Sequence, residues 1–311
     1  MVQLTGQASA ALCCCLLTAG CGVSPLATRV SAFGAAASLI AKDSSASYDT
    51  VERTVYNAEV SSLVLDFDTK GFDPAGIKPF LSGEDLAARH SMLDALQHYA
   101  TFLQDVGGNA PLDAVNTATA ELGQRLHSLS TNSALAKLKA NDDEVKGLTT
   151  AIDAAGQLLV ERKHQKALPP IVTAMQGVID RICALLDADL GSAPNAEGIG
   201  GRGLRLQLWT EYDRLIVNQK TWLDRNKTTL PPQEKADGIA KLPALVKEQR
   251  AADDTLVATQ NALKDLAKTH RALLTEHKRG TSFFTYVAEM KDDAERIAGF
   301  YNSLNFKVAT Q

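Results

Sequence analysis

Three residues at four-residue intervals, His90, Asp94 and His98, have the most suggestive spacing for chemistry in this chain. Residues four apart share one face of an α-helix, so adjacent members could hold a metal ion together or pass a proton between imidazole and carboxylate. The neighbouring Arg89 and Gln97 favour a simpler interpretation, in which this face is solvated and makes ordinary helix-surface contacts. We therefore expect no metal site and no cofactor, with these three residues as the only candidates for a metal or ligand.

Other spacings that could support catalysis lack the partners they need. Glu161 and His164 have the spacing of carboxylate-bridged metal bundles, which require that motif twice, and the sequence contains it once. His270 and His277 fall within an apolar heptad pattern, where a buried histidine satisfied by a partner is the expected arrangement. The nucleophile-elbow, phosphate-loop and zinc-protease motifs are absent. We expect a protein that is not an enzyme.

An apolar run over residues 8–17 leads into Leu-Thr-Ala-Gly-Cys at positions 17–21. The run is shorter than the roughly 20 residues of a membrane-spanning helix, which is typical of the apolar part of a signal peptide. Small residues directly before Cys21 fit a peptidase that admits only small side chains there. The segment resembles the lipobox of bacterial lipoproteins, and the body of the chain resembles no family.

This resemblance implies that residues 1–20 are removed as a signal peptide and that Cys21 carries the lipid, including palmitate-type acyl chains. It also implies a cell-envelope location, anchored in the outer membrane and facing the periplasm. Residues 1–9 contain no Lys or Arg, which favours a translation start further upstream or a weak signal. The alternative interpretation is an Ala-rich cytosolic tail.

The five cysteines are compatible with export. Cys13, Cys14 and Cys15 would leave with the signal peptide and Cys21 would be acylated, so Cys183 alone remains and no intramolecular disulfide can form. Cys183 lies on an apolar stripe of helical spacing, where a cysteine behaves as a small buried hydrophobe rather than a reactive thiol.

Composition predicts a folded helical protein. The 311 residues are 45% hydrophobic and 22% charged, enough to bury a large core. Only 5% are aromatic, which suits helices better than strands. A net charge of −4 with both signs interspersed argues against a nucleic-acid partner.

The apolar spacing predicts an all-α fold, an elongated antiparallel helical bundle with long heptad helices. The clearest pattern is a heptad series from Leu242 to His277, which indicates coiled-coil packing against neighbouring helices. Pro169 and Pro170 are expected to interrupt a helix. From the apolar spacing we expect one long helix or two over 27–65, with a weak Ser-rich middle at 44–47. Further helices are expected over 82–106, 111–129, 141–168, 171–190, 204–226, 232–279 and 281–306.

Composition also suggests where the chain divides. The glycine-rich segment 191–203 contains Gly198, Gly200 and Gly203 in the spacing of a dinucleotide-binding fingerprint, but no strand precedes it, so we interpret it as a flexible linker. The expected organisation is a signal peptide (1–20), a tether (21–28), an N-terminal helical bundle (29–190), a Gly-rich linker (191–203) and a C-terminal three-helix bundle (204–306).

These features lead to two hypotheses for function. The first is a non-catalytic cell-envelope lipoprotein, tethered to the membrane by its lipid, whose helical bundle binds a protein partner as an accessory, scaffold or inhibitor. The second is a periplasmic ligand- or metal-binding helical lipoprotein, which could be enzymatic, using the His90, Asp94 and His98 face or a pocket near Trp209. Exported iron-uptake proteins of the imelysin type are similarly α-rich, but their Gly-x-His-x-x-Glu signature is missing here.

Overall fold

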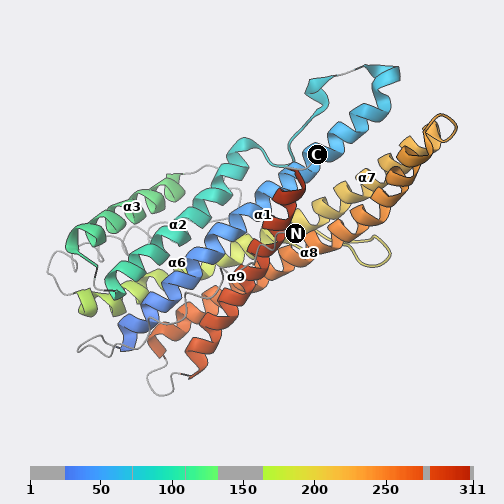
Figure 1. Ribbon diagram of the computed structural model, residues 1–311. Helices are drawn as coiled ribbons and strands as arrows, with labels where there is room; N and C mark the ends of the chain where they lie inside the picture. The colour runs from blue at the N-terminus through green and yellow to red at the C-terminus, as the bar shows by residue number, and fades with distance from the viewer. Residues whose placement is uncertain (1–24, 72, 109, 132–163, 276–280, 309–311) are drawn as a thin grey trace, which may run out of the picture.

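The chain folds into long helices that lie side by side and give the molecule an elongated shape (Figure 1). The computed structural model describes residues 25–71, 73–108, 110–131, 164–275 and 281–308. Of these residues, 87% are helical and none forms a β-strand, so the predicted all-α fold is confirmed. The elements are α1 (Pro25–Lys70), the 3₁₀-helix η1 (Pro74–Gly76), α2 (Gly83–Gly107), α3 (Leu112–Thr131), α6 (His164–Leu190), α7 (Gly203–Asn226), α8 (Pro232–Thr275) and α9 (Thr281–Val308).

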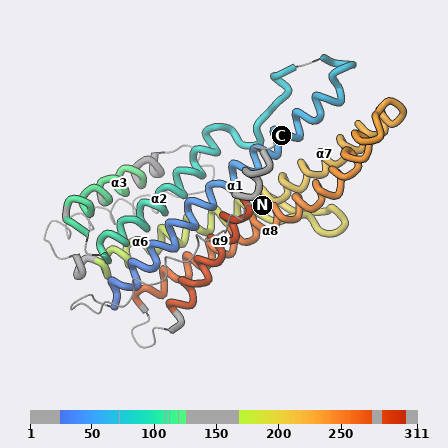
Figure 2. The backbone as a smooth tube through the Cα atoms, in the orientation of Figure 1, coloured from blue at the N-terminus to red at the C-terminus, as the bar shows by residue number. Residues whose placement is uncertain are grey.

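Helices α1 and α8 form the centre of the molecule. Helix α1 contacts α2, α7, α8 and α9, and α8 contacts α6, α7 and α9 as well as α1. Helix α3 covers the outer side of α2, away from α1 (Figure 2). Helix α2 is antiparallel to α1, because His90 near its start contacts Ser45 while Gly107 at its end lies against Ala27.

Helix α1 is continuous over 46 residues, although the sequence from Ser44 to Ser47 gives a weak apolar signal. Ser47 lies in the core between α8 and α9. It accepts a hydrogen bond of 2.8 Å from the hydroxyl of Tyr301, and its Oγ is 3.2 Å from Oγ1 of Thr259. Because the hydroxyls of Ser47, Tyr301 and Thr259 find partners in one another, Ser47 can lie inside the core without interrupting the helix.

Two glycines allow α1 and α2 to approach closely. A Cβ on Gly34 would lie 2.5 Å from the carbonyl oxygen of Ala100, and one on Gly107 would lie 2.7 Å from that of Ala27. The sequence predicts that Gly107 and Gly108 end α2 through left-handed conformations. Helix α2 does end at Gly107, but neither glycine has a positive φ. Gly107 is needed for the close helix contact, so the predicted conformational reason was wrong.

The prolines and glycines between Gly71 and Pro79 predict an irregular connection between α1 and α2, and Ser82 three residues before Asp85 predicts a helix cap; both predictions are confirmed. The Ser82 hydroxyl accepts a hydrogen bond of 3.0 Å from the backbone amide of Asp85. Just before the cap, the Glu52 carboxylate on α1 accepts hydrogen bonds from the amides of Phe80 and Leu81, at 3.3 and 2.7 Å. These contacts fix the start of α2 beside the middle of α1.

The heptad pattern of α8 is confirmed from Leu245 to Leu273, where the side chains at every predicted core position are buried. Leu242, the first position of the predicted series, is only partly buried. The burial beyond it explains why a helix of 44 residues is continuous with Pro243 as its twelfth residue, since packing of an apolar face supplies most helix stability in proteins.

The predicted interruption at Pro169 and Pro170 was wrong, because α6 runs through both prolines. Each proline removes one amide donor but has a φ suited to a helix. Leu168, Ile171 and Val172 on either side are buried in the core. Their packing outweighs the loss of two hydrogen bonds.

The glycine-rich segment 191–203 is an ordered loop between α6 and α7. Ser192 and Arg202 form an antiparallel bridge with two backbone hydrogen bonds of 2.9 Å. Inside the loop, the side-chain oxygen of Asn195 accepts a hydrogen bond of 2.9 Å from the amide of Ile199. The segment therefore has a defined turn structure in place of the flexible linker that its composition suggested.

Buried residues on both sides of this loop belong to one hydrophobic cluster. Leu190 before the loop and Leu204 after it are both buried in that cluster. Helices α7 and α9 pack on α1 as well as on α8, so the C-terminal helices share the core of the N-terminal ones. The predicted boundary between bundles over 29–190 and 204–306 falls inside this common core.

Candidate functional site

One end of the elongated molecule is built from α1, α7 and α8. Helix α2 begins beside Glu52, and α9 ends at Val308, whereas α1 continues to Lys70 next to the α7–α8 hairpin (Figure 1). A groove with a volume of about 790 Å³ lies among these three helices. Its size is within the range of small-molecule and peptide sites. We refer to it as the end groove.

Helix α1 supplies one wall of the end groove. Its contributors include Asn57, Val60, Ser61, Val64 and Leu65. These positions recur at intervals of three and four, the spacing of one helical face. The wall is therefore a mixed surface that offers an amide and a hydroxyl between aliphatic side chains.

Helix α7 supplies the floor. Tyr212, Leu215 and Trp222 line the groove, whereas Trp209, near which the sequence placed a possible pocket, does not. Burial raises the pKa of Tyr212 to about 12, so its phenol is neutral at physiological pH. Gly238 of α8 packs against this floor, since a Cβ there would lie 3.3 Å from the Trp222 ring.

Helix α8 supplies the second wall, which is mainly acidic. Glu234, Asp237 and Glu248 line it together with Lys241 and Leu245. Three carboxylates and one ammonium group give this wall a negative balance. The residues again follow three- and four-residue steps, so a single face of α8 looks into the groove.

Polar contacts below the groove hold α1 against α7. Arg214 Nη1 donates to Glu59 Oε1 at 2.5 Å, and Asn218 Nδ2 donates to Ser62 Oγ at 3.0 Å. Arg214 also reaches the buried carboxylate of Glu211, at 3.2 Å. Burial raises the pKa of Glu211, and the charge of Arg214 opposes this shift. These contacts fix the spacing of wall and floor.

Several apolar side chains at this end of the molecule are exposed. Tyr56, Val64 and Phe67 of α1 are 54%, 61% and 56% exposed, and Val217 and Ile239 are exposed on the α7–α8 hairpin. Of these five, Val64 lines the groove, whereas Val217 and Ile239 lie on helix faces that point away from the lining residues. Single exposed apolar residues are ordinary on protein surfaces, so Val64 is the one that bears on the groove.

The structure directs the predicted metal candidates to separate partners. His90 faces α1, where its Nδ1 lies 2.6 Å from Ser45 Oγ and its Nε2 lies 3.2 Å from Asp49 Oδ1. Both ring nitrogens therefore already have a protein partner.

The other two candidates turn toward α3. His98 Nδ1 lies 3.4 Å from Glu121 Oε2, and Asp94 Oδ2 lies 3.7 Å from Arg125 Nη1. The three side chains therefore do not converge on a common point. Within the described ranges, no group of three His, Cys, Asp or Glu side chains has the arrangement of a metal site.

His270 is buried in the core, as its heptad position predicts. Its Nε2 lies 2.8 Å from the Tyr99 hydroxyl and its Nδ1 lies 2.8 Å from Gln176 Oε1. Because an amide oxygen can only accept, Nδ1 carries the proton and Nε2 accepts from Tyr99. Burial lowers the pKa of His270 to about 4, which keeps the ring neutral.

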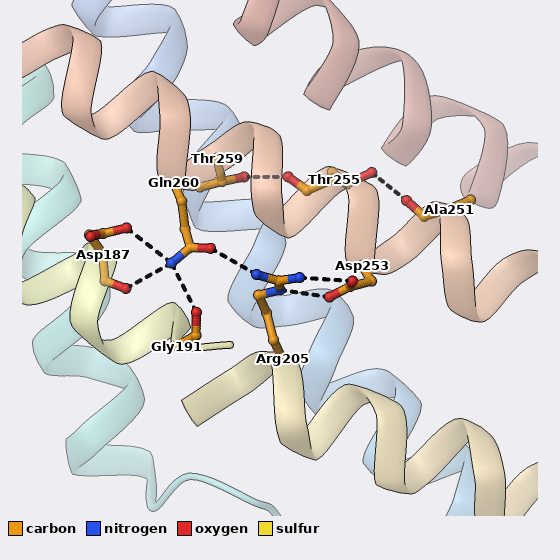
Figure 3. A network of polar contacts seen from close by, with 8 residues as sticks. All are labelled: Asp187, Gly191, Arg205, Ala251, Asp253, Thr255, Thr259 and Gln260. Atoms are coloured by element: carbon orange, nitrogen blue, oxygen red, sulfur yellow. Dashed lines mark hydrogen bonds and ion pairs between the residues drawn. The ribbon is translucent and has the colours of Figure 1, made fainter. Parts of the chain in front are cut away.

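A polar network ties the loop 191–203 to α7 and α8 (Figure 3). Arg205 donates two hydrogen bonds to the Asp253 carboxylate, at 2.7 and 2.9 Å, and a third to Gln260 Oε1 at 3.3 Å. The Gln260 amide in turn donates to the carbonyl of Gly191 at 3.0 Å and to Asp187 Oδ1 at 3.0 Å. Every member is engaged with another protein group, so this network stabilises the loop.

Cys183 is buried as predicted, and burial raises the pKa of its thiol to about 12. The predicted burial is confirmed, and a raised pKa leaves little of the reactive thiolate at neutral pH. Cys21, Glu161 and His277 lie outside the described residues, as does the side chain of His164. None of the helices that the structure describes is long and apolar enough to cross a membrane.

Fold and groove together define a class, an all-α helical bundle with an open groove at one end. In comparisons with protein-family models, with curated proteins and with solved structures, nothing matched this chain. The sequence suggested a possible pocket near Trp209 and missed this groove, because Trp222 and Leu215 fit equally well on a helix stripe that is packed in the core.

Proposed function

We propose that this chain is a non-catalytic cell-envelope lipoprotein, anchored through Cys21, whose end groove binds a protein partner. The observation that carries the proposal is the end groove itself, open between α1 and α8, with Val64 61% exposed in its α1 wall. Apolar side chains such as Val64, Leu215 and Trp222 in an open groove gain free energy when another surface covers them.

The chemistry of the lining favours binding over catalysis. Amide and hydroxyl groups, from Asn57, Ser61 and Asn218, are placed between the aliphatic side chains of Val60 and Leu215. A protein interface of this kind combines apolar contact with a few hydrogen bonds that fix orientation.

The alternative, a metal or ligand site on the face of His90, Asp94 and His98, has less support. Each of these side chains already contacts a residue of α1 or α3. A ligand would have to break these contacts at separate places along α2.

The proposal can be tested by site-specific photo-crosslinking in cells. A photoreactive amino acid at Val64, which is 61% exposed on the groove wall, should give a discrete crosslinked protein band. The matched control is Ile199, an apolar residue 66% exposed in the loop 191–203 and away from the groove. Equal crosslinking at both positions, or none at Val64, would contradict partner binding in the groove.

A further inference from the structure

We propose that the occupant of the end groove is an amphipathic α-helix of the partner, about three turns long, with basic residues along the flank that faces α8. This inference rests on the proposed function and adds the chemistry of the partner. It follows from three observations: the direction in which α9 runs along α1 and α8, the spacing of the residues that line the groove, and the charge of the α8 wall.

Helix α9 shows how a helix lies against α1 and α8. Near its start, the Phe283 ring lies 6.0 Å from the guanidinium of Arg29, and near its end Tyr301 donates to Ser47. In each pair the two residues are 254 positions apart in the sequence, so α9 runs parallel to α1 with the same register at both ends. By this register the last residue of α9, Val308, falls opposite Thr54.

Most of the end groove lies beyond the end of α9, whose last turn is opposite the first residues of the α1 wall. Its α1 wall extends from Thr50 to Leu65, and its other wall belongs to α8, the second helix on which α9 packs. Along the main part of the molecule, α9 packs on both α1 and α8 (Figure 1). Beyond the end of α9, the groove lies between the same two helices. A second helix placed end to end with α9 would continue packing that the fold already uses.

The spacing of the lining residues suits a helix. Tyr212, Leu215, Gln219 and Trp222 on α7 follow steps of three, four and three residues. Side chains at such intervals on neighbouring helices form the holes into which the side chains of a further helix pack. Beyond the end of α9, the α1 wall from Thr54 to Leu65 is about 17 Å long at 1.5 Å per residue, the length of about three helical turns.

The charge of the walls defines the sides of the partner helix. The α8 wall carries Glu234, Asp237 and Glu248 against one Lys241. The α1 wall presents Val60 and Val64 in its outer part, and its one cation, Arg53, lies next to the end of α9. A partner helix would therefore place lysine or arginine toward α8 and its apolar face toward α1 and α7. Opposite charges at the rim of an interface set orientation and association rate.

A synthetic helical peptide tests this chemistry directly. The probe is a fluorescein-labelled 16-residue peptide with a Leu/Ala face and lysines along one flank; a second peptide carries glutamates in place of the lysines. Each is titrated against the full chain by fluorescence anisotropy. We expect saturable one-to-one binding of the lysine peptide and at least tenfold weaker binding of the glutamate peptide.

Two variants of the chain locate the binding. Ser61→Trp fills the groove and should weaken binding of the lysine peptide at least tenfold. The double substitution Glu234→Lys, Asp237→Lys changes two exposed side chains and should reverse the preference, so that the glutamate peptide binds better. Glu197→Lys, exposed in the loop 191–203, is the matched charge control and should leave both affinities unchanged. Circular dichroism verifies the helical content of each variant.

Several outcomes would overturn the inference. They are an absence of binding by the lysine peptide, equal binding of both peptides, or binding that neither groove variant alters. Self-association of the chain that Ser61→Trp abolishes would instead identify a second copy as the occupant. If crosslinking at Val64 succeeds while the peptides fail, the proposed function stands and the helical partner does not. If crosslinking at Val64 fails, the proposed function itself is contradicted.

Discussion

The neutral ring of His270, on α8, contacts side chains of three other helices in the core. Its side chain is fully buried, contacts Tyr99 and Gln176, and packs edge-on against Phe33 with ring centroids 5.5 Å apart. Protonation would place a charge among these groups. Burial lowers the pKa of His270 to about 4, while the nearby Asp180 carboxylate opposes this shift. Acid should therefore destabilise the fold by favouring protonation of this buried ring.

The sign of this effect follows from proton linkage. An unfolded histidine titrates near pH 6.5, whereas His270 in the folded chain titrates at about 4. Between these values the unfolded chain binds more protons, so the contribution to stability is complete above pH 6.5 and falls as the pH drops toward 4. Between pH 7.5 and pH 4.5 the loss should be about 2 to 3 kcal/mol.

Urea unfolding of the wild type and of His270→Gln at these two pH values checks this prediction. Glutamine keeps a donor and an acceptor but does not titrate, so its free energy of unfolding should fall less on acidification, by about 2 kcal/mol. The comparison removes the contribution of other titrating groups, including the buried Asp293, whose pKa is raised by burial. Parallel pH dependence in both proteins would show that His270 is not the acid-sensitive group.

At the scale of elements, the loop 191–203 depends on glycine at its base. Gly191 has φ of 74°, and a Cβ there would lie 2.0 Å from the carbonyl oxygen of Arg202. Gly191→Ala therefore adds a steric clash to a strained backbone. We expect it to lower the free energy of unfolding by about 3 kcal/mol or more, measured by urea denaturation.

Gly198 in the same loop is the matched control for Gly191. It also has φ of 74°, but a Cβ there would have nothing within 4 Å. Gly198→Ala should cost only the strain of a left-handed conformation, about 1 to 2 kcal/mol. Equal losses for Gly191→Ala and Gly198→Ala would mean that the loop moves to relieve the contact at its base.

How well the sequence predicted each element depended on how local its cause is. The Ser82 cap and the heptad face of α8 were predictable, because the interacting positions lie within a few residues of one another. The role of Gly107 was not, since its Cβ would meet Ala27, eighty positions away. Composition alone could not distinguish the flexible linker expected over 191–203 from a loop closed by Arg205 and its partners.

The candidate site was harder to predict for the same reason. The end groove exists because α9 ends at Val308 and α2 begins at Gly83, while α1 continues to Lys70. Helix ends can be estimated from a sequence, but their relative positions in space depend on register between helices. The spacing that places His90, Asp94 and His98 on one helical face could be read from the sequence. The contact between His90 and Ser45 became evident only in the structure.

At the scale of the whole molecule, the end groove and the proposed anchor lie at different distances from the start of α1. The groove wall begins at Thr50 and reaches Leu65, about 40 to 60 Å along the helix from Pro25 at 1.5 Å per residue. If the lipid on Cys21 holds the start of α1 near the membrane, an upright molecule would present the groove well away from the bilayer surface. A partner would then be met in the periplasm or on a facing surface.

This geometry depends on the anchor, which Cys21→Ser tests. A single acyl chain binds membranes marginally, whereas two or more anchor stably, because each buried CH₂ contributes about 0.8 kcal/mol. The serine variant should fold, lose labelled palmitate and move from the membrane fraction to the soluble fraction, while crosslinking at Val64 in solution needs only the intact groove. If the variant still sediments with outer membranes after a salt wash and the wild type takes up no labelled palmitate, the lipobox interpretation is wrong.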